Sequence, residues 1–203
     1  WRRLSRYIRA LEDQGDLIRV THPVDCYLEA GCIADKLVKN DGPAVIFEKP
    51  RLADGTISEL PLAMNLFGTR RRTNQALRVN KPDEIGLKLT ELMKPDIGTF
   101  VKRPWKAWPL AKRALALPPK KVRKGACQQV RMPNPDVTKL PIPTTWMHDG
   151  GPFITLPLVV TKNPQTEEHN LGMYRAQVFG PTEVGLHWQM HKHGAEHAEA
   201  SDG

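Results

Sequence analysis

The sequence predicts an α/β domain at the amino-terminal end of the chain, then a proline-rich linker, then antiparallel strands that open a barrel or a sandwich. Three observations lead to this prediction. Helical and strand-like patterns alternate up to residue 93, prolines are frequent and apolar periodicity is weak at 104–145, and strand-like runs dominate from about residue 150. We therefore expect an α/β domain at 1–103, a linker at 104–145 and the start of a β domain at 146–203.

The first elements are predicted by the spacing of apolar residues. Apolar side chains recur at helical spacing within 4–11, and Gly15 follows where a helix C-cap is expected. The segment LIRV at 17–20 reads as a strand. Residues 27–38 repeat the helical pattern, and AVIF at 44–47 reads as a buried strand. This alternation is typical of an α/β module.

A further strand and a further helix are predicted before the linker. LPLAMNLF at 60–67 is an apolar, strand-like run that ends at Gly68 and a cationic run at 70–72. The interval from Pro82 to Met93 has helical spacing, with the proline suitably placed in the first turn. Pro95 is expected to end that helix.

The carboxy-terminal part contains three strand-like runs. They read FITLPLVVTK, GMYRAQVFG and VGLHWQMHK, and the segments NPQT and GPTE between them have the composition of turns. Two or three antiparallel strands are the simplest interpretation.

The positive charge of the chain is concentrated in one segment. The net charge is +8, and residues 101–124 hold nine Lys or Arg and no acidic residue. Trp105 and Trp108 lie within this run, so it could bind nucleic acid through phosphate contacts and base stacking. The alternative is a solvated linker that covers an acidic surface or a neighbouring subunit. No nucleic-acid-binding motif accompanies the run, so nucleic acid is the less favoured partner.

Other features of the sequence bound its class. No apolar run reaches the roughly 18 residues that a membrane helix needs, and no leader-like segment precedes Leu4, so we expect a cytoplasmic protein. The three cysteines, at 26, 32 and 127, form no C-x-x-C pair, so we expect them to be buried free thiols. The chain begins with Trp rather than Met and ends on the polar run EHAEASDG without a closing element. We therefore expect it to be part of a longer polypeptide.

Several common catalytic motifs are absent from the sequence. It contains no P-loop, no G-x-S-x-G elbow, no H-E-x-x-H pair and no G-x-G-x-x-G that opens a βαβ unit. DGG at 149–151 reads as a glycine turn, with Asp149 as a turn-former. Nucleotide hydrolysis, serine hydrolase chemistry and Rossmann-type hydride transfer are therefore poorly supported.

The segment EHNLGMYRAQV at 168–178 raises a question of geometry. In a regular strand, alternate side chains face opposite sides, so Arg175 would share a face with Leu171 and Met173. Either the strand is interrupted near Gly172, or Arg175 extends from an apolar wall toward an anion. A structural ion pair is the alternative role for this arginine.

Histidines are dense in the last strand-like run. If that run is one regular strand, His187, His191 and His193 project to one face and could bind a transition metal. No carboxylate follows at a matching position, so exposed or structural roles remain the alternative.

Four segments together resemble the UbiD family of decarboxylases, which use prenylated FMN. They are WRRLSRYIRALEDQGDLIRV, DGGPFITLPLVVTKNP, HNLGMYRAQVFG and HWQMHKHGA, and the most specific among them is the NxGMYR motif. The resemblance implies an α+β protein overall, in which the α/β domain is followed by the first strands of a split β-barrel that binds the flavin. The chain would then be the amino-terminal portion of such an enzyme.

The resemblance also implies roles for single residues. Asn170 would bind a divalent metal, Mn²⁺ or Mg²⁺, that bridges to the cofactor phosphate, with His191 at the same metal and K⁺ as a further cation. Arg175 would be the catalytic residue that orients the substrate carboxylate and the cofactor. The residues implied to contact the cofactor are Asn170, Met173, Tyr174, Arg175, His187, Trp188, Gln189, His191, Lys192 and His193. The remaining glutamate ligand and the acid and base carboxylates would lie beyond Gly203.

The implied activity is reversible, non-oxidative decarboxylation of an aromatic or α,β-unsaturated carboxylic acid. Loss of CO₂ from an sp² carbon needs an electron sink that no ordinary side chain provides, which is consistent with a modified flavin. The resemblance further implies a homodimer or hexamer, supplied with cofactor by a flavin prenyltransferase. Two alternatives stay open: a nucleic-acid-binding module built on the basic run, and a flavin-binding relative without decarboxylase activity.

Overall fold

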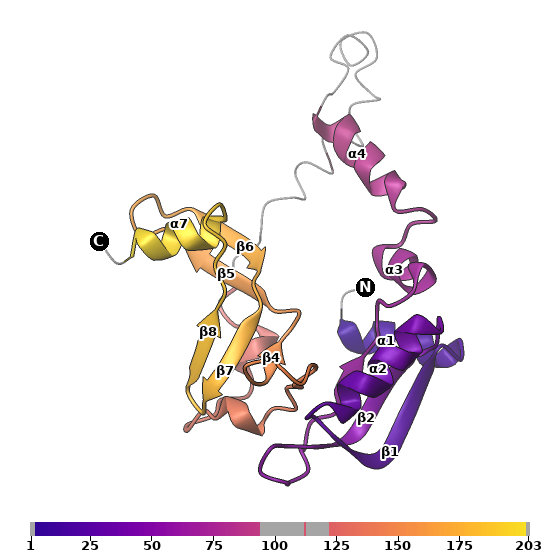
Figure 1. Cartoon of the computed structure of the whole chain (residues 1–203). Coiled ribbons are helices and arrows are strands. Elements are labelled where there is room, and N and C mark those ends of the chain that lie inside the picture. Colours follow the sequence, from indigo (N-terminus) through magenta and orange to yellow (C-terminus); the bar gives the residue numbers. More distant parts are fainter. Residues whose placement is uncertain (1–2, 94–111, 113–121, 202–203) are drawn as a thin grey trace. The chain divides into compact units, whose positions relative to one another are not determined.

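The computed structural model describes residues 3–93, 112 and 122–201 of the 203-residue chain. The described residues fall into two units, one from the ranges Trp1–Thr69 and Asn134–Gly203 and the other from the range Arg70–Pro133. The helices and strands are labelled in Figure 1. In chain order they are α1 (Leu4–Asp13), β1 (Leu17–Asp25), α2 (Glu29–Lys39), β2 (Ala44–Arg51), β3 (Leu62–Met64), α3 (Arg70–Leu77), α4 (Asp83–Met93), the 3₁₀ turns η1 (Ala126–Gln128) and η2 (Val137–Lys139), β4 (Phe153–Ile154), β5 (Leu158–Lys162), β6 (His169–Met173), β7 (Ala176–Gly180), β8 (Glu183–Leu186) and α7 (His193–Glu199).

The amino-terminal sheet has the order β1-β2-β3, with β1 parallel and β3 antiparallel to the central strand β2. The first four residues of β2 are all buried, as the continuous apolar run AVIF predicts. Val24, Ala30, Val45 and Phe47 form the buried core between this sheet and α2. The predicted helices and strands of this region are therefore confirmed, although β1 and β2 run further, and β3 is shorter, than their apolar segments.

The carboxy-terminal strands form two small antiparallel sheets, one of β4-β7-β8 and one of β5-β6. Among the described residues these strands do not close into a barrel. The predicted turns are confirmed. The carboxamide oxygen of Asn163 accepts hydrogen bonds from the backbone N–H groups of Gln165 and Thr166 at 2.8 and 3.1 Å, which folds the connection between β5 and β6.

The prediction that the strand-like run at 184–192 is one regular strand is wrong. Strand β8 ends at Leu186, which pairs with Ala176, the first residue of β7. Beyond this pair the partner strand is no longer present, so the ladder ends after the hydrogen bond from the N–H of His187 to the carbonyl of Arg175 at 3.3 Å. His187, His191 and His193 consequently do not share a strand face.

A helix that the sequence analysis did not predict follows this strand. Residues HGAEHAE form α7, whose alanines and glutamates have high helix propensity. The helix packs on β5 and β6 (Figure 1). The first four residues of the polar run EHAEASDG, in which no element was expected, therefore belong to α7.

The second unit contains the helices α3 and α4. The cationic run at 70–72, interpreted as a break, is the first turn of α3, because arginine is a good helix former. Helix α4 confirms the helix predicted up to Met93. The side-chain oxygen Oε1 of Glu84 accepts hydrogen bonds from the N–H groups of Asn80 and Lys81, both at 3.1 Å, at the start of α4. Pro95 lies outside the described residues.

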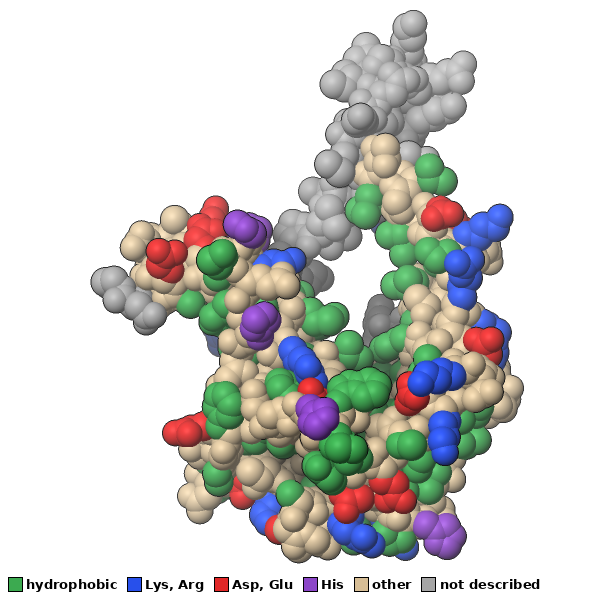
Figure 2. Space-filling model, viewed as in Figure 1, with side chains coloured by type: hydrophobic (Ala, Val, Ile, Leu, Met, Phe, Trp, Pro, Cys, Tyr) green, Lys and Arg blue, Asp and Glu red, His purple; other side chains and the backbone are tan. Residues whose placement is uncertain are grey.

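Many apolar side chains are exposed, as Figure 2 shows for one face of the molecule. Four of them form cross-strand pairs on one face of the β5-β6 sheet, Leu158 with Met173 and Val160 with Leu171. None of the described helices combines the length and hydrophobicity that crossing a bilayer requires. Of the basic run, only residues 112 and 122–124 are described, so the nucleic-acid hypothesis lies largely outside the described residues.

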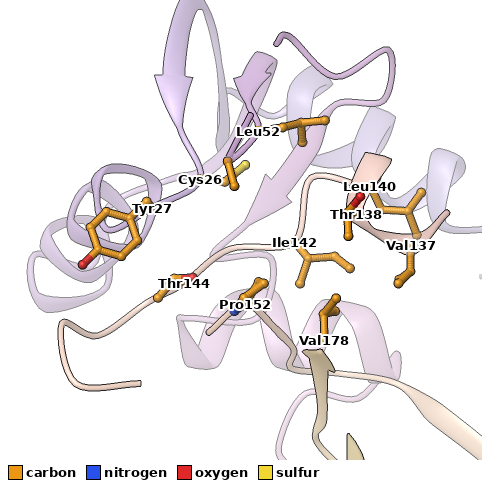
Figure 3. Close-up of a pocket in the computed structure, with 11 residues that line it drawn as sticks. Cys26, Tyr27, Leu52, Val137, Thr138, Leu140, Ile142, Thr144, Pro152 and Val178 are labelled. Atoms are coloured by element: carbon orange, nitrogen blue, oxygen red, sulfur yellow. The ribbon is translucent and has the colours of Figure 1, made fainter. Parts of the chain in front are cut away.

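Within the first unit, Thr144 is hydrogen-bonded to the segment that follows β1. The N–H of Thr144 donates to the carbonyl of Cys26 at 3.0 Å, and the N–H of Leu28 donates to the carbonyl of Thr144 at 2.9 Å. An apolar pocket of about 140 Å³ lies at this junction, and Figure 3 shows its lining side chains. Burial raises the pKa of the Cys26 thiol on its wall to about 11, with a smaller contribution from the Asp25 charge. All three cysteines are free, but only Cys26 is buried; the prediction of buried thiols is wrong for Cys32 and Cys127, which are exposed. The predicted division into domains stays a prediction.

Candidate functional site

The polypeptide changes sheets between Met173 and Ala176, inside the predicted motif. Strand β6 pairs with β5 up to Met173, and β7 begins at Ala176, where it pairs with Ile154 of β4. Tyr174 and Arg175 lie between the strands and belong to neither ladder. The interruption suspected near Gly172 is therefore present, two residues later. We call residues 174–175 the sheet break.

Tyr174 points into the protein and is only 6% exposed. Its hydroxyl oxygen accepts a hydrogen bond from the backbone N–H of Gly194 at 3.0 Å, in the first turn of α7. Its ring meets that of Trp188 edge to face, with centroids 4.7 Å apart and planes at 73°. Tyr174 therefore joins β6 to the start of α7.

Two glycines make room for this aromatic pair. A Cβ atom added at Gly172 would lie 2.3 Å from the Tyr174 ring, and one added at Gly194 would lie 2.4 Å from the ring of Trp188. Any other residue at these positions would displace the rings. The glycine of the NxGMYR motif is thus explained by the close approach of Tyr174.

Asn170 lies on β6 directly opposite Thr161 of β5. Its side-chain nitrogen Nδ2 donates to Thr161 Oγ1 at 3.3 Å and to the Tyr174 hydroxyl oxygen at 3.2 Å. Thr161 Oγ1 is in turn 2.9 Å from Nδ1 of His197, a residue of α7 that is 5% exposed. We call Asn170, Thr161, Tyr174 and His197 the Asn170 network.

Arg175 lies on the opposite side of the sheet break and is more exposed. Its Nη2 donates to Asp149 Oδ2 at 3.2 Å, and the side chains of the two residues are 43% and 15% exposed, respectively. The guanidinium carbon lies 3.7 Å from the centroid of the Phe153 ring, a cation–π contact that holds it against an apolar surface. The sequence analysis left two roles open for Arg175, an extension from an apolar wall toward an anion and a structural ion pair. The structure contains both the apolar wall, at Phe153, and the ion pair, with Asp149.

An open pocket of about 450 Å³ lies beside Arg175. Its lining residues are Phe153, Arg175, Gln177, Phe179, Gly185, Leu186 and His187. Mostly apolar walls with one guanidinium are suited to a small molecule that has an apolar body and an anionic group.

The remaining residues of the predicted site are spread over the end of β8 and the start of α7. His187 lines the pocket beside Arg175, and Trp188 packs on Tyr174. Gln189, His191, Lys192 and His193 are exposed, and Met173 is exposed on the β5-β6 sheet. Within the described ranges, no three His, Cys, Asp or Glu side chains gather as a metal site. The roles of these residues stay predictions.

Sequence reasoning missed two members of the Asn170 network and the partner of Arg175. Thr161 and His197 carried no motif, and Asp149 was interpreted as a turn-former. Asp149 does accept a turn hydrogen bond, from the N–H of Trp146 at 3.3 Å, through the same oxygen that pairs with Arg175. The predicted role of Asp149 as a turn-former is therefore confirmed, and Asp149 is in addition the ion-pair partner of Arg175.

Comparison with known proteins identifies the family. Residues 8–93 match the family model of the 3-octaprenyl-4-hydroxybenzoate carboxy-lyase N-terminal domain, and residues 120–202 match the Rift-related domain of the same family, UbiD. The chain belongs to the UbiD family. The UbiD resemblance seen in the sequence is thus confirmed.

The chain is also similar to a protein of Archaeoglobus fulgidus, with 43% identity over 194 residues. That alignment covers 96% of this UbiD chain but 39% of the relative. The chain therefore spans about two fifths of the length of the relative that it matches.

Solved UbiD-class structures share the fold. HmfF from Pelotomaculum thermopropionicum in complex with FMN has a TM-score of 0.72 at 21% identity, covering 96% of this chain and 38% of HmfF. Vanillic acid decarboxylase from Sedimentibacter hydroxybenzoicus in its closed form has a TM-score of 0.74 at 23% identity, covering 98% and 40% of the two chains. An evolved dimeric form of HmfF in complex with prFMN has a TM-score of 0.70 at 22% identity, covering 98% and 41%. The predicted fold class is confirmed as far as the chain extends: an α/β domain is followed by antiparallel strands, as in these UbiD-class structures.

Proposed function

We propose that the full-length protein is a prenylated-FMN-dependent decarboxylase of an aromatic or α,β-unsaturated carboxylic acid, and that this chain supplies part of its active site. The observation that carries the proposal is the arrangement at the sheet break. An amide suited to binding a cation lies on one side of the break, and an arginine beside an open apolar pocket lies on the other. Membership of the UbiD family and the flavins bound by related structures support the same activity.

Arg175 is proposed to orient the substrate carboxylate. Its planar guanidinium carries five N–H donors, and the pair with Asp149 uses only Nη2, so the group can engage a carboxylate while Asp149 holds it in place. Phe153 beneath the guanidinium and the apolar residues of the pocket lower the local dielectric constant. A lower dielectric constant strengthens the attraction between the arginine and a carboxylate.

On the other side of the break, the amide oxygen of Asn170 is a ligand of the kind that hard divalent cations accept. Nδ2 of Asn170 faces two hydroxyl oxygens, and no described residue donates a hydrogen bond to Oδ1, so this oxygen is available as a ligand. Amide and phosphate oxygens are ligands that Mn²⁺ and Mg²⁺ accept. Asn170, together with the exposed His191, is proposed to hold the metal that anchors the cofactor phosphate, with K⁺ as a further cation.

The prenylated flavin, when bound, supplies the electron sink for loss of CO₂. Met173, Tyr174, His187, Trp188, Gln189, Lys192 and His193 are the residues proposed to contact it. The carboxylates that transfer protons, and a glutamate ligand of the metal, are proposed to lie in the part of the full-length protein that this chain does not include. A flavin prenyltransferase is proposed to supply the cofactor.

The substrate is proposed to be an aromatic acid in the first instance. Related structures of similar fold include decarboxylases of vanillic acid and of 3,4-dihydroxybenzoic acid, which are therefore the first acids to assay in both reaction directions. A cytoplasmic homodimer or hexamer is proposed as the assembly, and one related structure is a dimeric form.

The test begins with mass spectrometry of the small molecules released when the natively purified full-length protein is denatured. Prenylated FMN in near-stoichiometric amount is expected. Arg175→Ala should then abolish CO₂ release while the flavin stays bound, whereas Arg19→Ala, which removes a remote ion pair with Glu12, should leave CO₂ release unchanged.

Three results would contradict the proposal. Absence of any flavin after co-expression with the prenyltransferase would remove the cofactor. Full activity of Arg175→Ala would remove the proposed role of the arginine. Bound prenylated FMN without CO₂ release from any acid would favour the flavin-binding relative that lacks decarboxylase activity.

A further inference from the structure

The side-chain amide of Asn170 can take two orientations, and two residues outside the predicted site can select one of them. A carboxamide has a donor end, the NH₂ group, and an acceptor end, the carbonyl oxygen, with nearly the same shape. Only the oxygen has lone pairs that can bind a cation. A metal site that uses Asn170 therefore needs the amide held with its nitrogen toward the protein and its oxygen outward.

Tyr174 cannot impose this orientation alone. Its oxygen accepts the hydrogen bond from the backbone N–H of Gly194, and it still has one proton to donate and one lone pair to accept with. The hydroxyl can therefore serve either end of the Asn170 amide at 3.2 Å.

Thr161 differs because its single hydroxyl proton has a second acceptor nearby. Nδ1 of His197 lies 2.9 Å from Thr161 Oγ1. If the hydroxyl donates its proton to Nδ1, the only role left for Oγ1 toward Asn170 is that of acceptor, and it must receive an N–H of Nδ2. His197 is then the neutral tautomer with its proton on Nε2.

We propose that Thr161 and His197 are positioning residues that fix the Asn170 amide with its carbonyl oxygen toward the metal. This inference rests on the proposed function, because it assigns a means of presenting the metal ligand Asn170. The chain of contacts runs from His197 Nδ1 through Thr161 Oγ1 to Asn170 Nδ2, and it joins α7, β5 and β6.

Burial and register favour a fixed arrangement. Thr161 and Asn170 are direct cross-strand partners, so their side chains lie on the same face of the sheet. Helix α7 packs on β5 and β6, and His197 is 5% exposed. Water therefore has little access to Nδ1 of His197, and this nitrogen stays within hydrogen-bonding distance of the Thr161 hydroxyl as its acceptor.

The test compares metal affinity in pairs of variants of the full-length protein. Thr161→Val keeps the shape and the strand propensity of threonine but removes the hydroxyl, whereas Thr161→Ser keeps the hydroxyl and loses a methyl group. His197→Leu removes the acceptor, whereas His197→Asn can place its Oδ1 near the position of Nδ1. Mn²⁺ binding to the metal-stripped protein is measured by electron paramagnetic resonance of the free ion, without any assay of turnover.

Thr161→Val and His197→Leu are expected to weaken Mn²⁺ binding by about 10- to 100-fold, as is typical when a residue that orients a metal ligand is removed. Thr161→Ser and His197→Asn are expected to bind close to wild type. If Thr161 had only a packing role, Thr161→Ser would weaken Mn²⁺ binding more than Thr161→Val does, because serine leaves the larger packing defect.

Two outcomes overturn the inference in distinguishable ways. If wild type binds Mn²⁺ more tightly than Asn170→Ala does, and Thr161→Val binds as tightly as Thr161→Ser, the positioning role is wrong and the proposed metal site stands. If wild type and Asn170→Ala bind Mn²⁺ equally weakly, the proposed metal site is wrong and the positioning role is wrong with it.

Discussion

Replacing Tyr174 with phenylalanine is expected to loosen the start of α7 while leaving the aromatic packing intact. The first N–H groups of a helix have no partner within the helix. The N-cap residue Lys192 provides no side-chain hydrogen bond, and the Tyr174 hydroxyl accepts the N–H of Gly194 instead. The ring of Phe would keep the edge-to-face contact with Trp188, so the substitution isolates the hydroxyl.

The expected magnitude follows from burial. Leaving the buried N–H of Gly194 without an acceptor costs about 1–3 kcal/mol. Asn170 also loses one of its two acceptors, but it is half-buried, so water can replace that bond at smaller cost. Because about 1.4 kcal/mol corresponds to a tenfold change, local opening of the first turn should become roughly 5- to 150-fold more frequent.

Hydrogen exchange of the full-length protein measures this directly. Amides in the peptide that covers 187–199 should exchange faster in Tyr174→Phe by that factor. Tyr7→Phe is the matched control, since its hydroxyl donates to the carbonyl of Leu66 at 3.0 Å, far from α7 in sequence. Wild-type exchange at 187–199 in Tyr174→Phe, or equal acceleration in both variants, would refute the reasoning.

Two further predictions concern ionisable groups outside the candidate site. With its pKa raised to about 11, Cys26 should carry roughly 200-fold less thiolate at pH 8 than a thiol of pKa about 8.5. Iodoacetamide should therefore label the exposed Cys32 faster than Cys26, as measured by peptide mass spectrometry. Equal labelling rates for the two cysteines would contradict the burial of Cys26. The hydrogen bond from Lys139 lowers the pKa of the Asp54 carboxyl in the folded protein. The stabilisation from this ion pair is therefore fully present above the unfolded-state pKa of about 3.9, and it is lost as the pH falls through the lower pKa of the folded state. The thermal midpoint of wild type should therefore exceed that of Asp54→Asn at pH 6, and this difference should shrink on acidification; a difference that does not depend on pH would contradict it.

The amino-terminal elements could be predicted because each buries apolar side chains in a periodic pattern. Apolar side chains at helical spacing in α1 and α2, and the continuous apolar run of β2, follow from that burial alone. The prediction failed at 187–193, where alternation alone suggested a strand. A strand also needs a partner, and β7 begins only at Ala176, a fact that lies outside the segment itself.

The candidate site was predictable only where a motif carried it. Asn170, Tyr174 and Arg175 stand in one motif, but Thr161 becomes a neighbour of Asn170 only through the register of the β5-β6 hairpin. The turn at Asn163 sets that register, since Lys162 then pairs with His169 and Thr161 with Asn170. Counting back from NPQT could have found Thr161. His197 could not be found in this way, because it lies on a helix that the sequence analysis did not predict.

The sheet break separates the two residues of one motif to which we assign different proposed roles, Asn170 and Arg175. In an unbroken strand, Met173 and Arg175 would face one side and Tyr174 the other, and all would follow the same ladder. Because the ladder ends at Met173 and a different one begins at Ala176, Tyr174 is free to turn inward beneath Gly172, while Arg175 turns outward onto Phe153. The amide network therefore depends on β5 and α7, and the arginine depends on β4 and the turn at Asp149. Separate parts of the fold thus position the two sides of the motif. Asn170, proposed to bind the cation, and Arg175, proposed to bind the substrate carboxylate, can therefore each be held rigidly without constraining the other.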